Sequence, residues 1–193
     1  MLPQTELELQ SPTAQAFLRR NFPRSEVRQV PMSGELPSGY CYTNVRRMID
    51  INGGRAQCGW TLSILPGRFV EALHHVVWEQ PNGELLDVTA AAYPGMVKPA
   101  TDFIVDSAID LGPHDPCVPS IFHQIDRSDG TKEYIDLTKR RMILRGKQNA
   151  LVLRGKWPSD AHERIGQELA QVDYRRDIYL ARMNAGDFTR VVG

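Results

Sequence analysis

Three residues of different types, spread over the middle of the chain, could together perform nucleophilic catalysis. Cys41 follows a glycine and a tyrosine at the predicted start of a helix, where the helix dipole favours a thiolate over a thiol. An imidazole such as that of His75 could act as general acid or base, and a carboxylate such as Asp87 could hold that imidazole in one tautomer. The chain supplies these groups in the order Cys, His, Asp, which predicts thiol-dependent acyl transfer. The alternative is that Cys41 is a small buried residue and Asp87 caps a turn.

A predicted hairpin determines which side chains meet His75. Pro81 suits the first central position of a type I turn, and Gly83 suits the left-handed position that follows, so the spacing predicts a three-residue loop. In that register His75 and Asp87 are diagonal neighbours on one face, ~7–8 Å apart at the backbone. The adjacent His74 falls on the apolar face, where we expect a core histidine with a backbone partner. A two-residue turn would exchange the two faces.

The elements that must position these residues alternate between helical and extended patterns, which predicts an α+β fold. Helices are expected over 13–21, 41–52 and 161–183, the last interrupted near Asp173. Strands are expected over 56–65, 69–79 and 84–89, with short elements over 103–111, 134–145 and 150–154. Five prolines among the first forty residues predict extended loop outside the first helix.

The segments around Cys41, His75 and Asp87 resemble the transglutaminase-like branch of the papain-fold cysteine hydrolases. They read Gly39-Tyr40-Cys41, His75-Val76-Val77-Trp78-Glu79 and Asp87-Val88-Thr89, where the family often has His-x-Trp-x-Glu and Asp-x-Thr. The resemblance implies a papain/transglutaminase-like fold, with a Cys-bearing helix packed on an antiparallel sheet and a C-terminal helix. It implies that Cys41 is the nucleophile, His75 the acid/base and Asp87 the orienting residue. Val77 and Tyr42 depart from the family, which commonly has aromatic and tryptophan residues there.

The residues expected to bind substrate lie next to this triad: Tyr40, Asn44 and Glu79. Glu79 falls on the glutamate of the family, although a solvated charge at a strand end is the alternative. Tyr40, Asn44 and the backbone N–H of Cys41 are the nearby candidates for an oxyanion donor.

A second resemblance extends over roughly residues 39 to 90, to an uncharacterised bacterial domain family. It is carried by Cys41-Tyr-Thr-Asn44-Val45, Gly53-Gly54, Gly59-Trp60, Glu71-Ala72, His75, Val77-Trp78, Asn82-Gly83 and Asp87-Val88-Thr89. Some members carry a cysteine-rich zinc-binding tail, which this sequence lacks. The prolines predict that residues 1–37 form an extended arm with a short helix, and the resemblances imply that residues 38–193 form a single cysteine-hydrolase-like domain.

The composition limits the classes of partner. The 23 basic and 23 acidic residues cancel, which argues against nucleic acid or a membrane as the main partner and leaves a protein or peptide substrate. No apolar run approaches the roughly 20 residues of a membrane helix. The acidic N-terminus is unlike a signal peptide, so we expect reduced cysteines in the cytoplasm, or export by a specialised secretion system.

Two further patterns favour ordinary structural roles. His114, Asp115, Cys117, His123 and Asp126 could be a metal cluster, but their spacing matches no common zinc pattern and we expect no metal. The basic segment 139–156 could contact phosphate or an acidic partner, although a solvated face fits the zero net charge better.

Phosphate-binding and serine-nucleophile motifs are absent from the sequence, so no cofactor is expected. The sequence therefore predicts an amidase, peptidase or deamidase acting on an amide or thioester. The alternative is an inactive papain-like fold that binds a protein or peptide along the edge of the hairpin.

Overall fold

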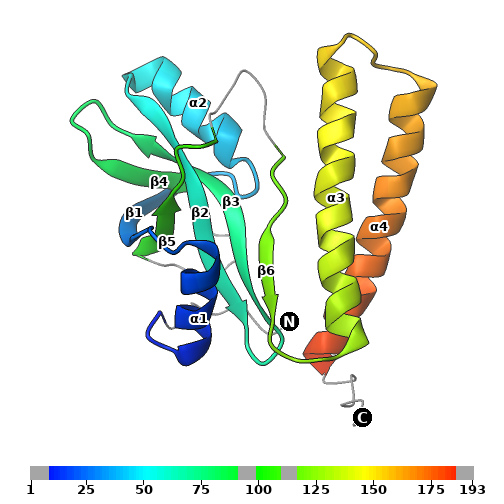
Figure 1. Cartoon of the computed structure of the whole chain (residues 1–193). Helices are drawn as coiled ribbons and strands as arrows, with labels where there is room; N and C mark the ends of the chain where they lie inside the picture. Colours follow the sequence, from blue (N-terminus) through cyan, green and yellow to red (C-terminus); the bar gives the residue numbers. More distant parts are fainter. Residues whose placement is uncertain (1–8, 91–98, 110–116, 186–193) are drawn as a thin grey trace. The chain divides into compact units, whose positions relative to one another are not determined.

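The computed structural model describes residues 9–90, 99–109 and 117–185 of the 193-residue chain (Figure 1). In these residues it contains four helices and a six-stranded sheet, which confirms the α+β class. The helices are α1 (Pro12–Asn21), α2 (Cys41–Asn52), α3 (Asp129–Leu153) and α4 (Asp160–Ala185). The strands are β1 (Val27–Leu36), β2 (Arg55–Leu65), β3 (Phe69–Glu79), β4 (Leu85–Thr89), β5 (Ala100–Val105) and β6 (Ile121–Gln124). Among the described helices, none combines the length and apolar character needed to cross a membrane.

The described residues fall into two compact units. The sheet unit contains those up to Leu62 and those from Ala72 to residue 109. The helical unit contains Ser63–Glu71 and the described residues from Cys117 onward. Both units are therefore assembled from separated stretches of chain.

The strand order is β2-β5-β1-β4-β3-β6, and β2 also pairs with β3. β1 runs antiparallel to β5 and parallel to β4, so the expected antiparallel sheet is in fact mixed. The parallel pairing places Met32 of β1 opposite Asp87 of β4. β4, which carries the candidate aspartate, is therefore held between two strands.

The strand β1 replaces the extended loop expected in this part of the chain. Its prolines suggested loop because proline cannot donate to a sheet ladder. Pro31, however, lies where β1 changes partner: residues up to Pro31 pair with β5, and Met32 begins the pairing with β4. The register then shifts between Met32 and Leu36, around Gly34 with φ +62°. The proline and the glycine thus occupy irregular positions of a strand, which local patterns do not reveal.

The hairpin of β3 and β4 has the predicted register. Trp78 pairs with Leu86 and Glu79 with Leu85. The N–H of Gly83 donates to the Gln80 carbonyl at 2.9 Å, and Gly83 has φ +87°. These contacts confirm the three-residue loop, and with it the assignment of each side chain to a face.

Helix α2 packs its apolar side on one face of this hairpin. Val45 is fully buried in a cluster with Val76, Trp78 and Val88, and Cys41 packs against the edge of the cluster. The helix ends at Gly53, whose carbonyl accepts a hydrogen bond from the Trp78 indole at 2.9 Å. Both ends of α2 are therefore tied to the strands that carry His75 and Asp87.

The helical unit consists mainly of two long antiparallel helices. The sequence predicted short elements over 134–145 and 150–154, but α3 is continuous through Gly146, which lies within ordinary contact distance of Cys117. The expected interruption of the last helix at Asp173 is also absent, since Asp173 accepts a hydrogen bond from Arg141 of α3 at 2.7 Å. In both places a contact between elements outweighs a weak local preference.

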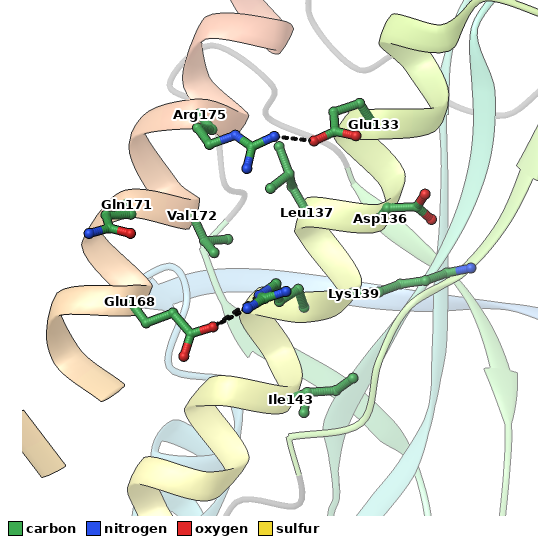
Figure 2. A pocket seen from close by; sticks show the side chains of 10 residues that line it. Glu133, Asp136, Leu137, Lys139, Ile143, Glu168, Gln171, Val172 and Arg175 are labelled. Carbon is green, nitrogen blue, oxygen red and sulfur yellow. Dashed lines mark hydrogen bonds and ion pairs between the residues drawn. The ribbon is translucent and has the colours of Figure 1, made fainter. Parts of the chain in front are cut away.

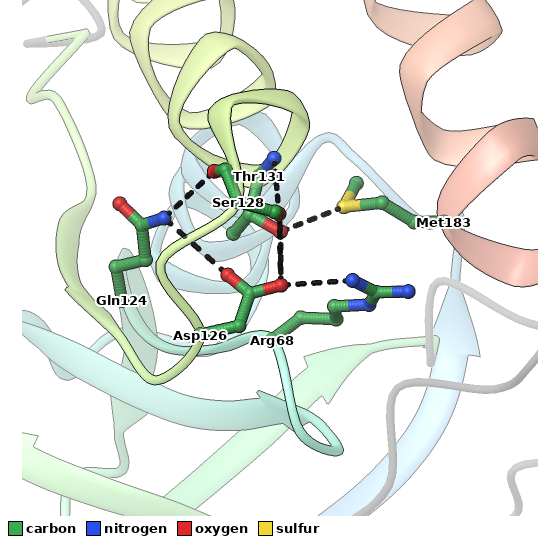
Figure 3. A network of polar contacts seen from close by, with 6 residues as sticks. All are labelled: Arg68, Gln124, Asp126, Ser128, Thr131 and Met183. Atoms are coloured by element: carbon green, nitrogen blue, oxygen red, sulfur yellow. Dashed lines mark hydrogen bonds and ion pairs between the residues drawn. The ribbon is translucent and has the colours of Figure 1, made fainter. Parts of the chain in front are cut away.

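A network of polar contacts fixes the beginning of α3 (Figure 3). Asp126 pairs with Arg68 at 2.8 Å and accepts hydrogen bonds from the hydroxyls of Ser128 and Thr131 at 2.9 and 3.0 Å. Ser128 is the N-cap of α3 and accepts from the Thr131 N–H. The ion pair lowers the pKa of Asp126, against the opposing effect of burial. One carboxylate thus connects the β2–β3 turn to the helix cap.

We expect Asp126→Ala to lower the free energy of unfolding by about 2 kcal/mol, because hydrogen bonds to a charged group contribute more than neutral ones. Urea denaturation followed by circular dichroism measures this change. The matched control is Asp129→Ala, which removes an exposed carboxylate from the first turn of the same helix and should cost about 0.5 kcal/mol. Equal losses in the two variants would contradict a specific role for Asp126.

Candidate active site

Cys41 is the first residue of α2. Gly39, with φ +79°, turns the chain into the helix, and the N-cap residue Tyr40 makes no side-chain capping hydrogen bond. The N–H groups of the first turn therefore lack a side-chain cap from Tyr40. The sulfur atom lies at the positive end of the helix dipole, as the sequence predicted.

His75 and Asp87 meet across the hairpin. The Nε2 atom of His75 lies 2.9 Å from Oδ2 of Asp87, and both side chains are almost completely buried. This contact is the predicted diagonal pair on the face opposite the α2 cluster. The Cys41 side chain lies close enough to the His75 ring to raise its pKa. The structure therefore brings together all three predicted residues.

The Asp87 carboxylate has two further partners. Oδ1 accepts from the backbone N–H of Thr89 at 3.1 Å, and Oδ2 accepts from the hydroxyl of Thr101 at 2.8 Å. Thr101 lies on β5. The sequence did not predict its role, because the segment before it resembles loop. The local pattern also does not reveal that β1 pairs with both β5 and β4. Thr101 orients the carboxylate that orients His75.

The electrostatics of this cluster favour a charged His75. Burial alone would lower the pKa of His75, but the charge and hydrogen bond of Asp87, together with Cys41, raise it to about 10. Burial opposes the ionised form of Asp87 as well, and His75 with the Thr89 and Thr101 hydrogen bonds lowers its pKa nonetheless. The two pKa directions together favour an imidazolium of His75 paired with an ionised Asp87.

Comparisons with protein-family models, with curated proteins and with solved structures find no match to this chain. The functional argument therefore depends on the site itself.

The three predicted substrate-binding residues lie in different environments. Tyr40 is 63% exposed, directly before Cys41, and is free to contact a ligand. Asn44 is buried, and its amide donates to the Pro37 carbonyl and to the Thr89 hydroxyl at 2.8 and 3.1 Å. Glu79 forms an ion pair with Arg55 at 2.7 Å.

These contacts give Asn44 a different role from the one expected. Both amide hydrogens are engaged inside the protein, so they are not available to a substrate or an oxyanion. Through Thr89, whose N–H donates to Asp87, the amide connects α2 with the end of β4. Asn44 therefore fixes the helix that carries Cys41 relative to the strand that carries Asp87.

The neighbouring His74 lies on the apolar face, as predicted, but its partner is a side chain. Its Nδ1 contacts the Tyr42 hydroxyl at 2.5 Å, where the sequence suggested a backbone group. The ring stacks on Tyr42 and meets the Trp60 ring edge-on. Among the described residues its Nε2 has no hydrogen-bond partner. Burial lowers the pKa of His74 to about 4, so this ring is neutral where His75 is charged.

His74 should make the protein sensitive to mild acid. The unfolded chain protonates this ring as the pH falls through about 6.5, whereas the folded protein does not until about pH 4, so stability declines across that window. We expect the free energy of unfolding to fall by about 2 kcal/mol between pH 7 and pH 5, and no such fall in His74→Phe. Urea denaturation of both proteins at pH 7 and pH 5 measures the difference. Parallel pH profiles would show that His74 titrates normally in the folded protein.

Of the residues considered above as a metal cluster, for which we expected no metal, His114 and Asp115 lie outside the described residues. In the described part of the chain no group of three or more His, Cys, Asp or Glu side chains could hold a metal ion. Cys117 contacts the Asn149 amide at 3.3 Å, and Cys58 is buried in the cluster beneath α2.

A groove of about 580 Å³ lies on the helical unit, and none of its lining residues belongs to the triad (Figure 2). Its charged side chains pair across the two helices, Arg140 with Glu168 and Arg175 with Glu133. Leu137 and Val172 form its apolar floor. These two ion pairs join α3 to α4, and the residues that line the groove include no cysteine, serine, threonine or histidine.

Proposed function

We propose that this protein is a thiol-dependent acyl-transfer enzyme with a papain/transglutaminase-like arrangement, which uses Cys41, His75 and Asp87 to act on an amide or thioester of a protein or peptide. The observation that carries the proposal is the buried His75–Asp87 pair, with the cysteine of a helix N-terminus close enough to act on the pKa of the same imidazole. A buried charged pair is costly to maintain, so its position beside a cysteine favours a catalytic role over a packing role.

The proposed reaction proceeds in two steps. The Cys41 thiolate attacks the carbonyl carbon and forms a C–S bond, and the carbonyl electrons move to oxygen. Collapse of this tetrahedral intermediate breaks the bond to the leaving amine or thiol, which takes the proton from the His75 imidazolium. Water, or an amine, then attacks the thioester while His75 accepts its proton, and the C–S bond breaks to restore the thiolate and the imidazolium. Asp87 holds the ring throughout.

Backbone N–H groups at the start of α2 are the proposed oxyanion donors. Since the Asn44 amide is engaged by Pro37 and Thr89, the N–H of Cys41 is the nearest candidate that remains of those suggested by the sequence. The helix dipole adds to its effect on a developing negative charge. Tyr40, exposed beside the nucleophile, is proposed to contact the substrate.

Binding of a peptide along the hairpin edge, the alternative suggested by the sequence, has no support in the strand pairing. β4 pairs with β1 on its other side, and β3 pairs with β2 and β6. Neither strand of the hairpin presents a free edge for an added strand. A non-catalytic binding role for the site would have to use side chains alone.

The proposal is tested by trapping the acyl-enzyme. The chain is mixed with peptide thioesters and activated esters, and intact mass spectrometry follows the protein over time. We expect a transient acyl adduct on Cys41 that decays by hydrolysis, a persistent or much slower adduct in His75→Ala, and none in Cys41→Ala. The matched control is Cys117→Ala, which removes a half-buried thiol outside the site and should behave as the native chain does. Absence of any adduct specific to Cys41 would favour a binding module.

A further inference from the structure

The end of α3 and the connection that follows it toward α4 contain seven successive exposed residues, 152–158, which we call the hairpin tip (Figure 1). Three of its side chains are large and apolar: Val152 and Leu153 are each 46% exposed, and Trp157 is 61% exposed. The other two tryptophans of the chain, Trp60 and Trp78, are almost fully buried. Adjacent exposed apolar residues of this size usually mark a contact surface.

Basic residues accompany these apolar side chains. The tip contains Arg154 and Lys156, both exposed, between Leu153 and Trp157. Residues 145–164, which surround the tip, contain five basic and two acidic residues, although the whole chain has no net charge. This end of the helical hairpin therefore carries a net positive charge, and an anionic partner is indicated.

The shape of the tip favours a lipid surface over a protein. A stable protein interface uses about 20–30 residues on each side, with complementary shapes, whereas the tip offers seven residues on a convex turn. A bilayer needs no shape complementarity. It accepts tryptophan and aliphatic side chains at the level of its headgroups, while lysine and arginine remain beside the phosphates.

We propose that the hairpin tip binds to anionic lipid surfaces by inserting Val152, Leu153 and Trp157 at the headgroup level, with Arg154 and Lys156 contacting lipid phosphates or carboxylates. This inference is independent of the proposed catalytic function. It revises the sequence-based expectation of no membrane partner, which depended on the total charge and not on its distribution.

The test uses the full chain and vesicles of phosphatidylcholine with or without about 30% phosphatidylserine, in flotation and fluorescence experiments. We expect binding only to the anionic vesicles, with a blue shift in tryptophan emission because Trp157 is the exposed indole. Arg154→Gln/Lys156→Gln should weaken binding about thirtyfold. Raising the salt to about 0.5 M should weaken it as well, because the attraction is screened.

The matched control is Arg19→Gln/Arg20→Gln, which removes two exposed basic residues from α1 and should change binding by less than about twofold. Val152→Ser/Leu153→Ser, with folding verified by circular dichroism, should weaken binding about tenfold and separate insertion from simple attraction. The proposal is overturned if the tip and control variants bind equally, or if vesicles bind without a change in tryptophan emission. Tip-dependent binding to heparin without binding to vesicles would overturn it in favour of a soluble polyanion.

Discussion

Cys41 is expected to react with iodoacetamide at pH 6 about a hundredfold faster in the native chain than in His75→Ala. A thiol with an ordinary pKa of about 8.5 is only about 0.3% ionised at this pH, so stabilisation of the thiolate by an imidazolium has a large effect on the rate. The structure supplies that imidazolium, because Asp87 raises the pKa of His75 to about 10 against the effect of burial. The rate is measured by mass spectrometry of the peptide that contains Cys41.

The other cysteines and the adjacent histidine provide controls for this experiment. Cys58 and Cys117, followed in the same digests, should react at rates that do not depend on His75. Asp87→Ala should slow Cys41 about tenfold, because the imidazole loses the charge that keeps it protonated. His74→Phe should leave the Cys41 rate nearly unchanged, since His74 faces the opposite side of β3. A Cys41 rate that is the same in His75→Ala and in the native chain would remove the nucleophile assignment.

Loss of the Asp87 carboxylate should cost more stability than any other single change in the site. We expect Asp87→Ala to lower the free energy of unfolding by about 3–5 kcal/mol at pH 5.5, because the buried His75 loses its counter-ion and must release its proton on folding or stay charged without a partner. Thr101→Val removes one of the hydrogen bonds to Asp87 and keeps its charge, so it should cost about 1–2 kcal/mol. Urea denaturation of the three proteins gives both values.

The cost of Asp87→Ala should also depend on pH in a defined direction. The folded pKa of His75 is raised, so its contribution is complete below the unfolded value of about 6.5 and is lost as the pH rises through about 10. The folded pKa of Asp87 is lowered, so its contribution is lost as the pH falls below about 4. The difference between native chain and variant should therefore be larger at pH 5.5 than at pH 9.5. A constant difference would show that the pair is not charged in the folded protein.

The part of the site that could be predicted from the sequence is the part governed by local geometry. Pro81 and Gly83 determined the turn, the turn determined the register, and the register placed His75 and Asp87 on one face. The helix that begins at Cys41 could also be predicted from the sequence, because its apolar residues recur at helical spacing and Gly53 ends it. In both cases residues that are close together in the sequence are sufficient to predict the local structure.

The parts that were missed depend on contacts between distant segments. Thr101 lies within hydrogen-bonding distance of Asp87 because β5 and β4 both pair with β1. The sequence did not predict β1, because Pro31 and Gly34 are untypical of a strand. Helix α3 continues through Gly146, which an isolated helix would not favour, and this residue lies within ordinary contact distance of the distant Cys117. The Tyr42–His74 contact joins a helix to a strand 32 residues away. Periodicity and turn chemistry carry no signal for such pairs.

The interleaving of the two units has a consequence for the growing chain on the ribosome. When synthesis reaches the end of β5, every residue of the Cys41, His75, Asp87 and Thr101 cluster has been made, but α3 and α4 have not. Leu65 and Phe69, at the turn between β2 and β3, are buried in the finished protein by Tyr134, Ile135 and Met183. Until those helices emerge from the ribosome, the apolar side chains of this turn are exposed to solvent, although the strands of the sheet can already pair with one another. Nascent chains halted there should be a preferred target for ribosome-associated chaperones.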